Sequence, residues 1–74
     1  MEFNITYVEF WNKIGHDLKF SLSELTYRGH YFLRDRPEIE EILGLEAKGC
    51  FLNILSFKVI DEKKFFLAKI KYGI

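Results

Sequence analysis

Two hydrophobic patterns overlap at the start of the chain. Apolar and polar residues alternate over positions 3–7, which is typical of a β-strand. Further along, apolar residues recur at the spacing of one helical face: Tyr7, Phe10, Trp11 and Ile14. Thr6 and Glu9 have the spacing of a capping box, and Gly15 suits the position after a helix. We therefore predict a helix over residues 6–14.

The segment 18–35 fits two interpretations. Three apolar residues alternate with polar ones at its start, and a glycine-centred turn at Gly29 precedes a short apolar run. On this basis we predict a β-hairpin. The alternative is a helix over residues 22–28, capped by Ser21 and Glu24 and ended by the same glycine. The pattern alone does not choose between them.

A short helix is predicted over residues 37–43. Pro37 is well suited to a first helical turn, and Gly44 suits the position after the last turn. Three acidic residues lie in this segment, where the N-terminal end of a helix favours negative charge: Glu38, Glu40 and Glu41. We treat them as a secondary candidate surface for a basic partner. Residues 45–49 are then a connection.

The segment 51–72 is predicted to be a β-hairpin with a polar loop over residues 61–64. Pairing Ile60 with Phe65 gives one almost wholly apolar face, the predicted core face: Leu55, Phe57, Val59, Phe66, Ala68 and Ile70. The other face mixes apolar residues with lysines: Ile54, Lys58, Phe65, Leu67, Lys69 and Lys71. We take this mixed face as the candidate partner-binding site.

The composition is that of a folded chain. Hydrophobic residues make up 49% of the 74 residues and aromatic residues 18%, which is ample material for a core. This length allows one domain, residues 1–74. We expect an α+β fold in which a small antiparallel sheet of three to four strands packs on two short helices.

Charge argues against a dedicated nucleic-acid binder. The formal net charge is zero, whereas such proteins usually carry a basic surplus that neutralises phosphates. Residues 50–74 nevertheless hold five lysines against two acidic residues. A small nucleic-acid-binding domain that uses the lysine-rich hairpin therefore stays as the alternative function.

No residue pattern indicates catalysis. Cys50 is the only cysteine, it lies outside any redox or protease motif, and we expect it to be buried and inert. His16 and His30 lack the close paired spacing of zinc ligands, and no glycine-rich nucleotide motif is present. We expect a protein that is not an enzyme and uses no cofactor or metal.

The single cysteine excludes an internal disulfide, and the first residues lack the features of a signal peptide. No apolar run is long enough to span a membrane. These features favour a cytoplasmic protein without a membrane partner.

The predicted function is protein binding. Both faces of the hairpin at 51–72 carry large apolar residues, more than one small core can cover, and an uncovered apolar patch normally marks an interaction site. A homo-oligomer is compatible with this pattern. By association with size and composition alone, the expected class is a stoichiometric inhibitor or immunity-type protein, such as those that phages and mobile elements use against host defences like CRISPR.

Overall fold

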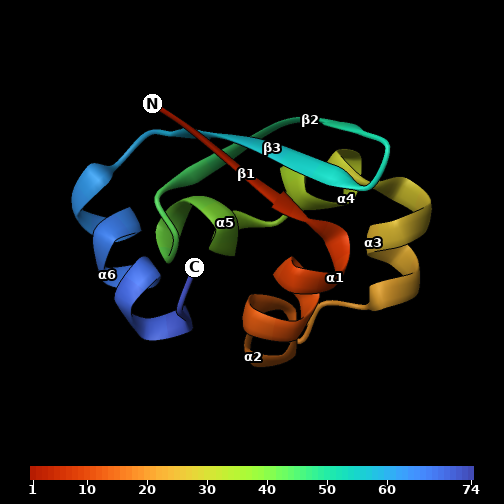
Figure 1. The fold of residues 1–74 in the computed structure, drawn as a ribbon, viewed down its shortest axis with the longest axis horizontal. Coiled ribbons are helices and arrows are strands. Elements are labelled where there is room, and N and C mark those ends of the chain that lie inside the picture. Colours follow the sequence, from red (N-terminus) through yellow and green to blue (C-terminus); the bar gives the residue numbers. More distant parts are fainter.

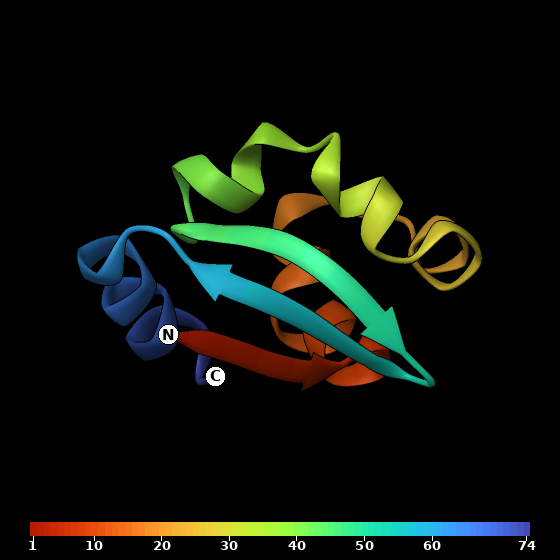
Figure 2. The same cartoon turned by 90° about the horizontal axis from the view of Figure 1, so that it is seen from above.

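Three antiparallel strands form a sheet in the order β1-β3-β2, and the helices lie below it or beside its β2 edge, which leaves the other face uncovered (Figures 1 and 2). The computed structural model describes residues 1–74. The strands are β1 (Glu2–Thr6), β2 (Leu45–Phe51) and β3 (Ile54–Val59). Helices make up 54% of the residues and strands 24%. The predicted α+β fold with a three- to four-stranded antiparallel sheet is confirmed, although it has more than two helices.

Both N-terminal patterns are realised, one after the other. The alternating residues form β1, and the chain then enters α1 (Tyr7–Phe10), the π-helical turn η1 (Trp11–Gly15) and α2 (His16–Leu18). Thr6 caps this helix, because its Oγ1 accepts a hydrogen bond from the Glu9 N–H at 3.2 Å. The predicted helix and its cap are confirmed.

The predicted end of that helix at Gly15 is wrong. The helical backbone continues through Gly15 and ends at Lys19, which adopts a left-handed φ of 60°. Gly15 is buried, and a Cβ there would lie 2.8 Å from Cδ1 of Trp11. Gly15 therefore allows the indole ring to pack closely against the backbone, and it does not end the helix.

The predicted hairpin over residues 18–35 is also wrong, and the helical alternative is confirmed. The segment forms α3 (Leu22–Arg28) and α4 (His30–Arg34), joined at Gly29 with a φ of 60°. The Ser21 hydroxyl accepts the N–H of Glu24 at 3.4 Å, as the capping pattern indicated. Next, α5 (Pro37–Glu41) confirms the helix predicted near Pro37.

The segment predicted as a connection is instead β2. At its start, Leu45 and Ala47 are buried while Glu46 and Lys48 are exposed, so the strand alternates. Gly44 precedes it with a φ of 65°, and a Cβ at Gly44 would collide with the Asp61 carbonyl oxygen. Only glycine fits at this position, where the backbone passes close to Asp61.

The C-terminal half of the predicted 51–72 hairpin is wrong. Its first strand is confirmed as β3 only from Ile54, because Phe51 belongs to β2 and residues 52–53 form a turn. Residues after Ile60 form α6 (Glu62–Tyr72). The Asp61 carboxylate accepts the Lys64 N–H at 3.1 Å, so the predicted polar loop is the capped start of this helix. Helical spacing buries Phe65 and Ala68 and leaves Phe66 and Ile70 exposed. Phe65 was predicted to face outward and Phe66 and Ile70 to face the core, so these three predictions are wrong; Ala68 is buried as predicted.

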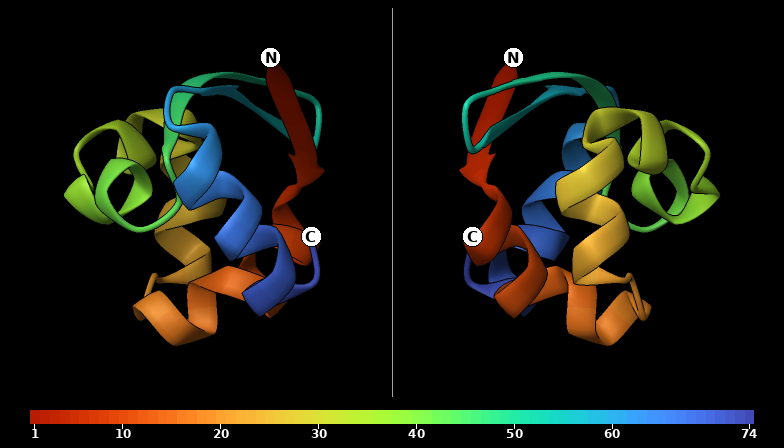
Figure 3. Two further views of the ribbon diagram at one scale, coloured as in Figure 1. Left: turned by 90° about the vertical axis from the view of Figure 1, so that its left-hand side faces the viewer. Right: turned by 90° about the vertical axis from the view of Figure 1, so that its right-hand side faces the viewer.

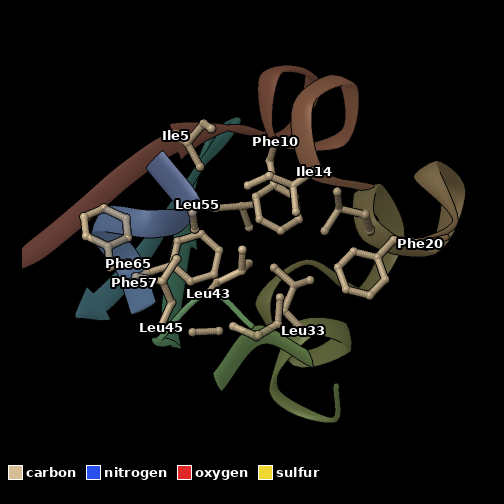
Figure 4. Packing of buried hydrophobic residues seen from close by; sticks show 14 of the residues in the cluster. Ile5, Phe10, Ile14, Phe20, Leu33, Leu43, Leu45, Leu55, Phe57 and Phe65 are labelled. Carbon is tan, nitrogen blue, oxygen red and sulfur yellow. The ribbon is translucent and has the colours of Figure 1, made fainter. Parts of the chain in front are cut away.

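The core lies between the sheet and the helix layer and contains no buried polar side chain. Figure 2 shows α6 at one end of the sheet, and Figure 3 shows the helices gathered below it. Phe10 and Phe57 stack at the centre with ring centroids 5.6 Å apart (Figure 4). The ring centroids of Phe3 and Phe65 lie 5.1 Å apart. These rings join β1, β3, α1 and α6 into one core.

Candidate interaction surface

The six residues of the predicted mixed face do not form one surface. Ile54 and Lys58 lie on the outward side of β3, whereas Leu67, Lys69 and Lys71 belong to α6. Phe65 is only 2% exposed and lies in the core. The residues from position 65 onward lie in a helix, and a helix points in different directions residues that a strand would place in one row.

Two of these lysines are already engaged within the chain. The Lys69 Nζ lies 5.6 Å from the centre of the Phe65 ring, and the Lys71 Nζ lies 3.8 Å from the Asp17 carboxylate. Tyr72 donates a 2.6 Å hydrogen bond to the same carboxylate. Partial burial, together with this hydrogen bond, raises the pKa of the Tyr72 phenol to about 12.

The acidic secondary candidate surface lies on α5. Glu40 and Glu41 are exposed and Glu38 is half-buried. Nothing in the contacts of α5 assigns it a partner, so its role stays a prediction.

The outward face of the sheet carries no helix and consists of three cross-strand rows. The first row is charged, with Lys58 between Glu2 and Glu46. Within this row the pKa of the Glu46 carboxylate is lowered, chiefly because its Oε1 accepts a hydrogen bond from the Lys48 Nζ, 2.7 Å away. The second row is small and polar: Asn4, Ser56 and Gly49. The third row is mostly apolar: Thr6, Ile54 and Phe51.

The apolar row continues around the β2–β3 turn. Leu52 and Asn53 form this turn, and Leu52 is 81% exposed with a φ of 58°. The Asn53 carbonyl accepts the Tyr7 N–H at 2.9 Å, which holds the start of α1 and its exposed Val8 against the turn.

A pocket of about 280 Å³ opens next to this turn, where the junction of α3 and α4 meets β2. Among the residues that line it are Tyr7, Tyr27, His30, Tyr31 and Cys50. The side chains of Tyr27 and Tyr31 are exposed. We call the exposed apolar and aromatic residues around the turn and this pocket the hairpin end: Val8, Tyr27, Tyr31, Phe51, Leu52 and Ile54.

The pocket owes its shape to a glycine and a bulge. The β2–β3 register shifts between Ala47 and Gly49, so Cys50 lies opposite Leu55. Across the pocket, a Cβ at Gly29 would come within 3.2 Å of the Cys50 Sγ and 3.1 Å of the Tyr7 hydroxyl. A larger residue at this positive-φ position would therefore crowd both groups.

The polar groups of this pocket are suited to hydrogen bonding. Partial burial, together with a hydrogen bond to Cys50, raises the pKa of Tyr7 to about 12, so the phenol stays protonated at neutral pH. The buried Nδ1 of His30 has no hydrogen-bond partner. Nowhere in the chain do three or more His, Cys, Asp or Glu side chains form a group that could hold a metal ion.

The prediction that Cys50 is buried is wrong, because the residue is exposed at the pocket. We therefore expect the folded protein to react with a thiol reagent such as DTNB within minutes at about pH 8, because the sulfur is accessible. The measurement is the absorbance of the released thiolate, compared with a Cys50→Ser control. Reaction only after denaturant is added would contradict the exposed position.

A second apolar area lies on α6. Phe66, Leu67 and Ile70 are exposed on this helix. In Figure 1, α6 and the β2–β3 turn are at opposite ends of the molecule, so the two areas are separate.

Sequence reasoning missed most of the hairpin end, although one signal was present. Leu52-Asn53 is a two-residue connection between apolar segments, and asparagine is common in such turns. The tyrosines of α3 and α4 gave no comparable signal, because they come next to β2 only through the fold.

None of the helices combines the length and the apolar character needed to cross a membrane. Comparisons of the chain with protein-family models, with curated proteins and with solved structures found no match.

Proposed function

We propose that this protein is a non-enzymatic protein-binding module and that the hairpin end is its binding surface. The observation that carries the proposal is the gathering of six exposed apolar and aromatic residues from α1, α3, α4 and the β2–β3 hairpin. Exposed apolar side chains gathered at one end of a small domain are costly in water, and such areas commonly mark an interaction site. Aromatic residues are enriched at such sites and provide much of their affinity.

Leu52 gives the strongest support within this surface. A leucine with a φ of 58° costs about 1–2 kcal/mol relative to a residue that tolerates this conformation. Its side chain adds little to the core, because it is exposed. Strained backbone at a surface site often reflects a functional constraint. Contact with a partner would offset both the strain and the exposure.

Within this class, the narrower proposal is a stoichiometric inhibitor or immunity-type protein of a phage or mobile element, acting for example on a CRISPR effector. This narrower proposal rests on the small size and the composition of the chain alone.

The nucleic-acid alternative has weaker support. Lys58 lies between two glutamates in its row, and Lys71 is beside Asp17. A stacking platform for single strands needs basic and aromatic groups along one groove. The lysines that were expected to form it lie on different elements.

The proposal is tested by replacing Phe51 with a photo-crosslinking phenylalanine analogue in the cells that express the protein. The matched control carries the analogue at Phe66, on the separate α6 area. A defined protein should be captured from position 51 and not from position 66. Capture from position 66 alone would contradict the proposed surface.

The purified captured protein then allows a quantitative test with Leu52→Gly. This change should weaken binding about 30-fold, equivalent to about 2 kcal/mol, because it removes an exposed apolar anchor. It should also raise the melting temperature, because glycine tolerates positive φ. Leu67→Ala on α6 is the control and should bind like the wild type. Unchanged affinity of Leu52→Gly would contradict the proposal.

A further inference from the structure

The strand β1 is a free edge of the sheet. In the order β1-β3-β2 it pairs on one side only, with β3. Figure 3 shows α4 and α5 beside the opposite edge, next to β2, and no helix beyond β1. The sheet therefore ends at β1 with nothing alongside.

The hydrogen bonds show which backbone groups are unpaired. Met1 accepts the Val59 N–H at 2.9 Å, and the Tyr7 N–H donates to Asn53 at 2.9 Å. Bonded and non-bonded pairs alternate in an antiparallel ladder, so the odd-numbered residues of β1 bond to β3. The N–H groups of Glu2, Asn4 and Thr6 consequently point away from the sheet.

The other edge has the protection that β1 lacks. The β2 strand contains an irregularity between Ala47 and Gly49, with the exposed Lys48 inside it. Bulges and lysines are common devices that prevent edge strands from pairing with other chains. No bulge, lysine or proline interrupts β1. The contrast identifies β1 as the edge that is open to a further strand.

We propose that β1 pairs with β1 of a second copy of this chain, antiparallel and centred on Asn4. In this register Asn4 lies opposite Asn4 of the second copy, and Glu2 lies opposite Thr6 of the second copy. All three outward N–H groups then face carbonyl acceptors. The two sheets become one continuous six-stranded sheet.

The sequence of β1 fits itself in this register. No like charges lie opposite each other, because Glu2 faces a threonine. Met1 and Val8, at the two ends of the strand, are 61% and 63% exposed in a single copy. The register places Met1 beside the start of α1 in the second copy, where Val8 lies. Pairing thus brings exposed apolar groups together at both ends of the joint, which favours a second copy over an unrelated peptide.

A pair of cysteine variants tests the register. Asn4→Cys in a Cys50→Ser background places the two Cα atoms about 5.5 Å apart, inside the range of about 4.4–6.8 Å that a disulfide spans. The control is Glu2→Cys in the same background, where the two Cα atoms lie about 14 Å apart, four residues along the strand. Mild oxidation should convert Asn4→Cys to a covalent dimer on a non-reducing gel and leave Glu2→Cys monomeric. No dimer from Asn4→Cys, or an equal yield from both variants, would overturn the proposal.

A second pair tests whether the backbone makes the contact. Asn4→Pro removes an outward N–H without removing a bond to β3, and proline is tolerated at such edge positions. Asn4→Ala keeps the N–H and is the matched control. In sedimentation velocity up to about 1 mM, the wild type and Asn4→Ala should dimerise, and Asn4→Pro should stay monomeric with an unchanged circular dichroism spectrum. A monomeric wild type over this range would overturn the proposal. Leu52→Gly should dimerise normally, because Leu52 lies in the β2–β3 turn and not on the outward edge of β1.

Discussion

Replacing Phe57 with alanine is expected to remove most of the folding stability of the chain. Phe57 is 1% exposed, lies in the central strand β3, and stacks on Phe10. Large-to-small changes at such sites cost about 3–5 kcal/mol. Small domains have a total stability near the lower end of about 5–15 kcal/mol, because a short chain buries a small share of its surface. The loss is therefore close to the whole margin.

The measurement is urea denaturation followed by far-ultraviolet circular dichroism. Ile54→Ala is the matched control, because Ile54 lies on the same strand with its side chain on the outward face. Surface changes of this kind usually shift stability by about 0.5 kcal/mol or less. A Phe57→Ala variant with the wild-type midpoint would show that the core face of β3 is wrongly assigned.

Local signals predicted the elements in which period and capping agree. The alternation along β3 identified its buried and exposed faces correctly, and Pro37 with Gly44 bracketed α5. Thr6 marked the start of the first helix. Each of these signals depends on residues close in sequence, which is why the sequence alone was sufficient.

Sequence reasoning failed where one segment satisfied both periods. Leu18, Phe20 and Leu22 alternated with polar residues, but Leu22 begins α3, and the Ser21 cap favours the helix. In α6, Phe65 and Ala68 are buried at helical spacing, while Phe66, Leu67 and Ile70 are exposed. A helix with apolar residues on several sides has no clear apolar face, and its sequence then also resembles a strand. The Asp61 cap at its start and Gly73 at its end, with a left-handed φ of 69°, were the local features that favoured the helix.

The hairpin end depends on contacts that no local pattern reveals. Cys50 and Tyr7 meet because a register shift in β2 and the glycine between α3 and α4 bring three elements together. Tyr27 and Tyr31 join them from the α3–α4 pair. Their side chains are far apart in sequence, so only the tertiary structure defines this surface.

The two neighbouring phenylalanines of α6 provide the clearest test of the C-terminal segment. Phe65 is 2% exposed, and its ring centroid lies 5.1 Å from that of Phe3. Phe66 is 52% exposed. Phe65→Ala should cost about 3–5 kcal/mol through the cavity it leaves in the core. Phe66→Ala should change stability by about 0.5 kcal/mol, because its side chain is largely in water already.

The comparison is internally matched, because both changes delete the same side chain from adjacent positions of one helix and alter helix propensity equally. A strand paired with β3, as the alternation of residues 65–72 suggested, requires the opposite order, with Phe66 in the core and Phe65 outside. The two denaturation midpoints therefore distinguish the helix from the strand directly. A larger loss for Phe66→Ala than for Phe65→Ala would contradict α6, and it would return Phe65, Leu67, Lys69 and Lys71 to a single outward face.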